Sequence, residues 1–144
     1  MIGKCNCGSV QFELLGKVPG LYKCHCSLCR KQSGCGSNAA TIVKSQDFEW
    51  VSGVESVKAW RKATGFNSHF CSECGSPVPN PIMGKQLMWI PVGLLSNPDT
   101  KIVAHLWLES KESWDAIDDA SKMYQGMPEN LVNFVDYLYA NTST

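Results

Sequence analysis

The sequence has no excess of either charge and no long hydrophobic run. Thirteen basic and thirteen acidic side chains give a formal net charge of zero over 144 residues. General nucleic-acid binders and binders of anionic membranes carry a basic patch, so this balance argues against both classes. The longest uncharged apolar stretch, Leu87 to Leu95, has nine residues, whereas roughly 20 are needed to span a bilayer. We therefore expect no nucleic-acid partner and no membrane partner.

Charged residues are also scarce, at 18% of the chain, while apolar residues make up 44%. Disordered chains show the opposite balance, so the composition indicates a globular fold. The length is that of one domain, and no repeat, low-complexity tract or charged linker divides the chain. A single Lys precedes Cys5, which leaves no room for a signal peptide. We expect a soluble, cytoplasmic protein.

Several short segments have the composition of β-strands. Residues 10–14 alternate between apolar and polar, as a strand with one wet face does. Turn signals such as Pro19-Gly20 and Thr64-Gly65 separate these segments. The pattern predicts a mainly β, antiparallel domain. The other expected strands lie at 39–43, 48–51, 57–60, 66–70, 87–92 and 102–108.

The last third of the chain has helical character. An apolar face recurs at helical spacing and consists of Leu131, Phe134, Val135, Tyr137 and Leu138. Pro128 suits the first helical position, so we predict a helix over about 128–139, and a weaker one within 110–124. Residues 1–127 then form the β domain, and 128–144 form a C-terminal helical extension of the same domain. This helix either caps the core or contacts a second subunit in a homodimer.

Eight cysteines are the most informative feature of the sequence. The cytosol keeps thiols reduced, so in a protein without an export signal they predict metal binding rather than four disulfides. Seven fall into three clusters, and Cys35 stands apart. The clusters are Cys5-x-Cys7, Cys24-x-Cys26-x-x-Cys29 and Cys71-x-x-Cys74.

The spacing of these clusters favours two zinc sites. Structural zinc takes four ligands, whereas catalytic zinc keeps three protein ligands and one open position. The simplest division gives a closed four-cysteine site (Cys5, Cys7, Cys71 and Cys74) and an open three-cysteine site (Cys24, Cys26 and Cys29). A single zinc ribbon fits poorly, because 41 residues separate the second cluster from the third, against about 15–20 in common ribbons. Disulfides, an iron–sulfur cluster and two purely structural zinc sites are the alternatives. The last of these needs Cys35 or a His as a fourth ligand.

The motifs around the clusters are distinctive: Cys5-x-Cys-Gly-x-Val-x-Phe, Cys24-His-Cys-Ser-x-Cys-Arg-Lys-x-Ser-Gly and Phe70-Cys-x-x-Cys-Gly-Ser-Pro. Together they resemble the glutathione-dependent formaldehyde-activating family, also called the centromere protein V domain. The likeness runs from about residue 2 to about residue 120 and includes all seven clustered cysteines. It implies a β-tent fold with two zinc ions, a structural one at the four-cysteine site and a second one at the three-cysteine site.

The resemblance also implies an activity, the condensation of formaldehyde with glutathione to S-hydroxymethylglutathione, which is a carbon–sulfur lyase reaction. On physical grounds, zinc held by three thiolates is a weak Lewis acid, but it can take up a substrate thiol as thiolate for attack on an aldehyde. Arg30 and Lys31 follow the third ligand, and they either hold the carboxylates of glutathione or are solvated surface charges.

We therefore predict a zinc-dependent lyase that joins glutathione, or another thiol, to formaldehyde or a small aldehyde. A non-catalytic zinc-binding module for a protein partner is the alternative.

A few other residues have more than one interpretation. Cys35 is a small buried residue, a fourth zinc ligand or a reactive thiol, and we favour the buried role. His25 lies between two ligands, so its side chain should point away from the metal into a structural hydrogen bond. Trp60, Trp89 and Trp107 are candidates for lining a pocket.

Overall fold

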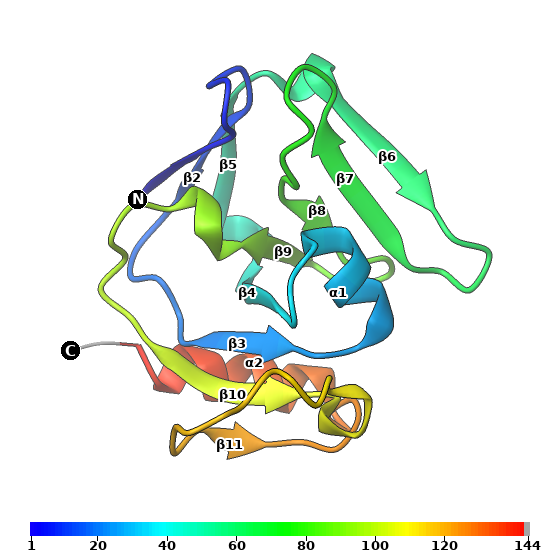
Figure 1. Cartoon of the computed structure of the whole chain (residues 1–144). Helices are drawn as coiled ribbons and strands as arrows, with labels where there is room; N and C mark the ends of the chain where they lie inside the picture. Colours follow the sequence, from blue (N-terminus) through cyan, green and yellow to red (C-terminus); the bar gives the residue numbers. More distant parts are fainter. Residues whose placement is uncertain (143–144) are drawn as a thin grey trace.

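The structure is a computed structural model that describes residues 1–142 (Figure 1). A mainly β fold with a short C-terminal helix is confirmed. No helix in this range is both long and apolar enough to cross a membrane. The strands are β1 Ile2–Lys4, β2 Gln11–Leu14, β3 Leu21–Cys24, β4 Asn38–Lys44, β5 Phe48–Ser52, β6 Val57–Arg61, β7 Asn67–Cys71, β8 Asn80–Pro81, β9 Leu87–Pro91, β10 Ile102–Leu106 and β11 Lys122–Met123. The helices are α1 Ser27–Ser33 and α2 Leu131–Ala140.

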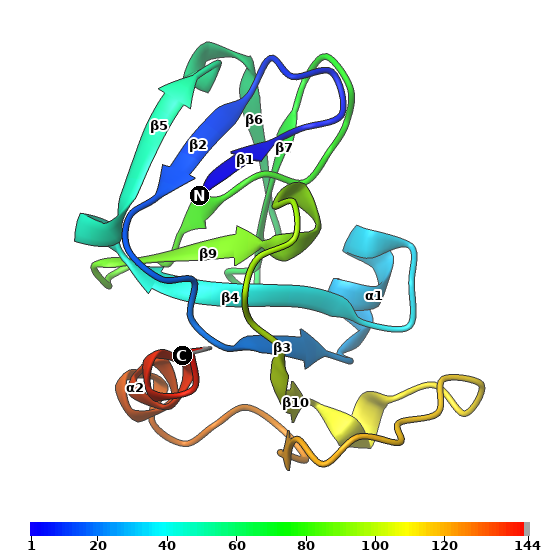
Figure 2. The same ribbon diagram turned by 90° about the vertical axis from the view of Figure 1, so that its left-hand side faces the viewer.

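A six-stranded sheet forms the base of the molecule, in the order β11-β10-β3-β4-β9-β8. The pairs β3–β4, β4–β9 and β8–β9 are antiparallel, as expected. β10, however, runs parallel to both β3 and β11, so the expectation of purely antiparallel strands is wrong at this edge. Residues 92–101 carry the chain from β9 to the far side of β3 (Figure 2). Such a crossover, unlike a tight hairpin, joins strands that run in the same direction.

Two smaller antiparallel sheets stand on this base, one of β1, β2 and β5 and one of β6 and β7. They lean towards each other above β4 and β9, as the word tent describes (Figure 1). Between the first small sheet and the base lies a core that includes Phe12, Leu14, Val43 and Ile90. A separate small cluster joins the two small sheets and consists of Cys5, Val10, Cys71 and Val78.

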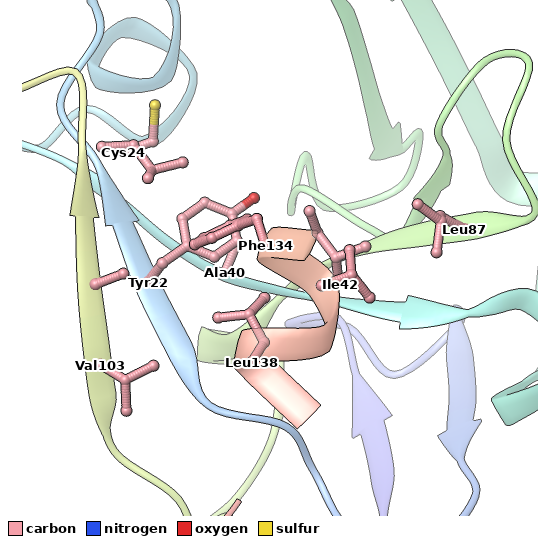
Figure 3. Packing of buried hydrophobic residues seen from close by; sticks show 11 residues of the cluster. Tyr22, Cys24, Ala40, Ile42, Leu87, Val103, Phe134 and Leu138 are labelled. Atoms are coloured by element: carbon pink, nitrogen blue, oxygen red, sulfur yellow. The ribbon is translucent and has the colours of Figure 1, made fainter. Parts of the chain in front are cut away.

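The helix α2 packs on the base, on the side away from the small sheets (Figures 1 and 2). It begins at Leu131 rather than at Pro128, because the side chain of Asn130 accepts a hydrogen bond from the backbone N–H of Asn133 at 3.0 Å and caps the helix there. The last two residues of the predicted extension, 143 and 144, lie outside the described part of the chain. Figure 3 shows the buried cluster that α2 shares with the base, which includes Tyr22, Ile42, Val103, Phe134 and Leu138.

The segment between β10 and β11 forms no α-helix, so the weaker helix predicted within 110–124 is wrong. This segment has no continuous apolar face, and Trp114 is 68% exposed. Its contacts are polar instead. The Lys111 ammonium donates to the backbone carbonyls of Glu112 and Asp115, at 3.1 and 2.9 Å.

Candidate functional site

The four-cysteine site lies where the two small sheets meet. Cys5 follows β1 and Cys71 ends β7, and both are buried. The four Sγ atoms lie within 4.8 Å of one another, with Cys5 to Cys7 at 3.6 Å and Cys7 to Cys71 at 3.8 Å. Four sulfurs around a tetrahedral zinc at about 2.3 Å are about 3.8 Å apart. The side chains therefore fit a closed four-thiolate zinc site.

Both halves of the four-cysteine site contain the same local structure, a Cys-Gly-Ser turn. Gly8 and Gly75 each have φ of +78°, a left-handed conformation that glycine adopts without steric cost. The turn at Gly75 is closed by a hydrogen bond from its backbone N–H to the carbonyl of Cys71, at 2.7 Å. The hydroxyl of Ser76, 3.3 Å from the Cys74 sulfur, lowers the pKa of that thiol to about 5. A thiol that ionises this readily is a ready metal ligand.

The three-cysteine site lies where β3 ends and α1 begins. Cys24 ends β3, Cys26 caps α1, and Cys29 lies in its first turn. The Cys26 sulfur accepts a hydrogen bond from the backbone N–H of Cys29 at 3.4 Å, which fixes the cap. All three Sγ atoms lie within 4.8 Å of one another. The structure thus brings together the two sets that the spacing predicted, and each set has the donor chemistry that zinc prefers.

The three thiols cannot ionise independently. The side chain of Cys24 lowers the pKa of Cys26 to about 2, while Cys26 in turn raises the pKa of Cys24 to about 12. Hydrogen bonds with Cys24 and Cys26 also raise the pKa of Cys29. Three adjacent thiolates repel one another, and a bound divalent cation would offset that repulsion. The electrostatics of the set therefore fit a metal site.

Cys35 does not belong to the three-cysteine set. It is exposed, so the expectation of a small buried residue is wrong. It follows Gly34, which ends α1 in a left-handed conformation (φ +67°). With this exposed thiol outside the set, the three-cysteine site has three candidate ligands within the described residues.

Two adjacent hollows open beside the three-cysteine site, with volumes of about 440 and 400 Å³. Cys29 lines both of them, and so do Tyr22, Phe66 and Met127. We refer to the two together as the cleft, the larger being the outer hollow and the smaller the inner hollow. The inner hollow is also lined by Cys24 and Cys26, so all three thiols of the site face it.

Two of the three tryptophans suggested as pocket residues lie in the cleft. Trp89 lines the outer hollow and Trp107 the inner one, whereas Trp60 is 53% exposed and lines neither. Tyr22 was missed by the sequence analysis. One signal could have identified it, because residues two apart on a strand share a face and Tyr22 precedes Cys24 by two positions on β3.

Burial raises the pKa of Tyr22 well above its ordinary value. The hydroxyl therefore stays protonated and can donate a hydrogen bond within the cleft.

Arg30 and Lys31 do not line either hollow among the described residues. The guanidinium of Arg30 forms an ion pair with Glu112 at 2.5 Å, and its Nε donates to the carbonyl of His25 at 3.3 Å. Lys31 is exposed. Lys31 forms no ion pair within the described residues and is accessible to a ligand, whereas Arg30 would first have to leave Glu112.

A chain of buried imidazoles supports the loop that carries the thiols. His25 Nε2 lies 2.9 Å from His105 Nδ1, and His105 Nε2 lies 2.9 Å from a carboxylate oxygen of Asp119. Both histidines are 1% exposed, and burial lowers the pKa of His25. The predicted structural hydrogen bond of His25 is confirmed, and it anchors the residue between two candidate ligands.

Comparisons with known proteins indicate which family this chain belongs to. A model of the family described as glutathione-dependent formaldehyde-activating enzyme matches residues 1–110. A protein of Halomonas elongata that carries a provisional name of the same kind is 29% identical over 143 aligned positions, which cover 90% of each chain. The crystal structure of a Rhodobacter sphaeroides protein has a TM-score of 0.57 over 72% of this chain and all of that chain, with 23% identity, so this likeness concerns the fold. Since the family match covers most of the chain and both cysteine sites, the protein belongs to the glutathione-dependent formaldehyde-activating family.

Proposed function

We propose that this protein is a zinc-dependent carbon–sulfur lyase. It joins glutathione, or another thiol, to formaldehyde or a small aldehyde, and the reaction takes place at the three-cysteine site. Support comes from the family match, from the provisional name of the Halomonas elongata relative, and from the geometry of the two cysteine sets.

One observation carries the proposal, the different surroundings of the two cysteine sites. The three thiols of Cys24, Cys26 and Cys29 line the inner hollow. The four-cysteine site lines neither hollow, and two of its members, Cys5 and Cys71, are buried in a small cluster with Val10 and Val78. The first set therefore faces a hollow that a substrate can occupy, whereas no cysteine of the second set lines either hollow. We therefore assign the chemistry to the three-cysteine site and a structural role to the other.

The residues suit a reaction between a thiol and a carbonyl. A zinc ion bound by these three thiolates would accept a substrate thiol at its fourth position and keep it deprotonated. In the overall reaction the S–H bond of the thiol breaks, a bond forms between that sulfur and the carbonyl carbon, and the proton ends on the former carbonyl oxygen. No electrons leave or enter the pair of substrates, so no oxidant or reductant is required.

The chain itself supplies positioning and a hydrogen bond. Tyr22 and Cys29 both line each of the two hollows, so we propose that the Tyr22 hydroxyl donates to the carbonyl oxygen as negative charge develops there. The side chains of Leu106 and Trp107 keep the inner hollow apolar, which strengthens that hydrogen bond. At the rim, we propose that Lys31 meets a carboxylate of glutathione, with Arg30 as a second contact after it leaves Glu112.

The test is the rate of adduct formation between glutathione and formaldehyde, followed by NMR exchange spectroscopy, together with zinc content by mass spectrometry. The purified protein should hold two zinc ions and accelerate the exchange. Cys26→Ser should hold one zinc and lose the acceleration. Cys35→Ala, which also removes one thiol near α1, is the matched control and should keep both. A wild-type protein that holds two zinc ions and gives no acceleration would support the non-catalytic module instead.

A further inference from the structure

The cleft is larger than formaldehyde requires. Its two hollows measure about 440 and 400 Å³. Formaldehyde has two non-hydrogen atoms, and one water occupies about 30 Å³ of liquid, so a substrate of that size would leave most of the cleft to solvent. Pockets of about 300–1,000 Å³ are typical of larger ligands. We infer that the preferred aldehyde carries a sizeable apolar group, aromatic or branched alkyl, and that this group occupies the outer hollow. The inference rests on the proposed function.

The lining of the cleft has the chemistry of such a group. No Asp, Glu, Lys, Arg or His is among the residues that line either hollow in the described part of the chain. The walls of the outer hollow are aromatic and aliphatic instead, and they include Ile42, Phe66, Ile82, Trp89 and Leu131. Burying an apolar group against such walls is favourable in proportion to the area removed from water.

The amide side chains in the outer hollow are already engaged with the protein. Gln32 uses both ends, since its oxygen accepts from Asn38 at 2.8 Å and its nitrogen donates to Ser68 at 3.3 Å. The side-chain oxygen of Asn67 accepts from Arg61 at 2.8 Å, and the side-chain nitrogen of Asn80 donates to the carbonyl of Pro81 at 3.2 Å. These bonds fix the amides as parts of the wall. They reduce what the hollow can offer to a polar ligand and leave its apolar surface as the main source of binding.

Glutathione is poorly matched to this hollow. It carries two carboxylates and an ammonium group, and burying a charge without a partner is costly. Its charged ends must therefore lie at the rim or in solvent, with only its sulfur near the three thiols. Of the two reactants, the aldehyde is then the one whose substituent can extend from the inner hollow, past Cys29, into the outer hollow.

The experiment compares phenylacetaldehyde with formaldehyde as the partner of glutathione, using the zinc-loaded protein. The acceleration over the uncatalysed exchange should be at least about tenfold greater for phenylacetaldehyde, since one methylene in an apolar pocket is worth about tenfold or more. Phe66→Ala should reduce this preference about tenfold. Trp60→Ala removes an aromatic side chain from the same β6–β7 hairpin but outside the cleft, and should leave the preference unchanged.

A binding measurement gives an answer that does not depend on turnover. The unreactive analogue 2-phenylethanol should change the tryptophan fluorescence, because Trp89 and Trp107 line the cleft, and it should bind more weakly to Phe66→Ala. If Phe66→Ala does not fold, Met127→Ser serves in its place, since Met127 lines both hollows and is 55% exposed. Acceleration with formaldehyde but no preference for phenylacetaldehyde, and no binding of 2-phenylethanol, would overturn this inference alone. Acceleration with neither aldehyde would overturn the proposed function and this inference with it.

Discussion

Replacing Cys71 by Ser removes one of the four thiols that join the β1–β2–β5 sheet to the β6–β7 hairpin. The side chain of Cys71 is fully buried, and its sulfur lies 3.8 Å from that of Cys7. Structural zinc contributes about 10–16 kcal/mol of binding free energy in small zinc fingers, and the whole free energy of unfolding of a domain is about 5–15 kcal/mol. The loss of this site is comparable to the total stability, so Cys71→Ser should be largely unfolded.

The stability lost on removing the four-cysteine site can be compared with that lost on removing the three-cysteine site. Cys7 and Cys71 are 64 positions apart in the chain, whereas Cys24 and Cys29 are five apart. A cross-link restricts the unfolded chain more when it closes a longer loop. This difference in loop length alone makes the four-cysteine site contribute about 2 kcal/mol more to the free energy of unfolding than the three-cysteine site. Cys26→Ser should therefore fold, with a smaller decrease in melting temperature than Cys71→Ser.

The assay is thermal unfolding by circular dichroism, with zinc content measured on the same samples under reducing conditions. Cys71→Ser should show little cooperative unfolding, and Cys26→Ser should unfold cooperatively with one zinc bound. A Cys71→Ser protein with the wild-type melting temperature would refute the structural assignment. Equal loss of structure in both variants would refute the assignment of a structural role to the four-cysteine site alone.

Three further predictions follow from other parts of the structure. Cys35→Ala should keep both zinc ions and its affinity for glutathione, and a zinc count of one would show that Cys35 is a ligand. Leu138→Ala should lower the free energy of unfolding by about 2–5 kcal/mol, because Leu138 is fully buried between α2 and the base sheet, and an unchanged urea midpoint would contradict that packing. Hydrogen bonds from Ser121 and then His105 hold the pKa of Asp119 below its usual range, so its stabilising effect is complete at neutral pH and is lost as the pH falls through the folded-state pKa. Asp119→Asn should thus be less stable than wild type in urea at pH 7, and the difference should shrink below about pH 4; a difference that grows in acid would refute the hydrogen-bonded role.

Sequence reasoning succeeded where one local pattern determines the structure. The alternation at residues 10–14 predicted β2, since one face of that strand is buried and the other is partly exposed. The cysteine spacing predicted both thiol sets, because a metal needs a fixed number of ligands whatever the fold between them. β3 was missed for the converse reason. Three of its four residues are buried, so the alternation that marks a half-exposed strand is absent.

The helix α1 and the cleft lay beyond this kind of reasoning. α1 has seven residues and none of them is buried, so it has no apolar face to detect, and the Cys26 cap holds its start. The walls of the cleft come from β3, β9, the turn before β7 and the segment before α2, represented by Tyr22, Trp89, Phe66 and Met127. These residues are far apart in the sequence and share no spacing rule, since tertiary packing alone brings them together.

The position of β7 has a mechanical consequence. Its last residue, Cys71, is fixed in the four-cysteine site, and Phe66, just before its first residue, forms a wall of the cleft. The strand between them is about 17 Å long and is held at its Cys71 end. A tilt of about 5° at that end would shift Phe66 by about 1.5 Å. A misplacement of about 1 Å can cost a hundredfold in rate. The four-cysteine site thus helps to set the width of a cleft that its thiols do not touch.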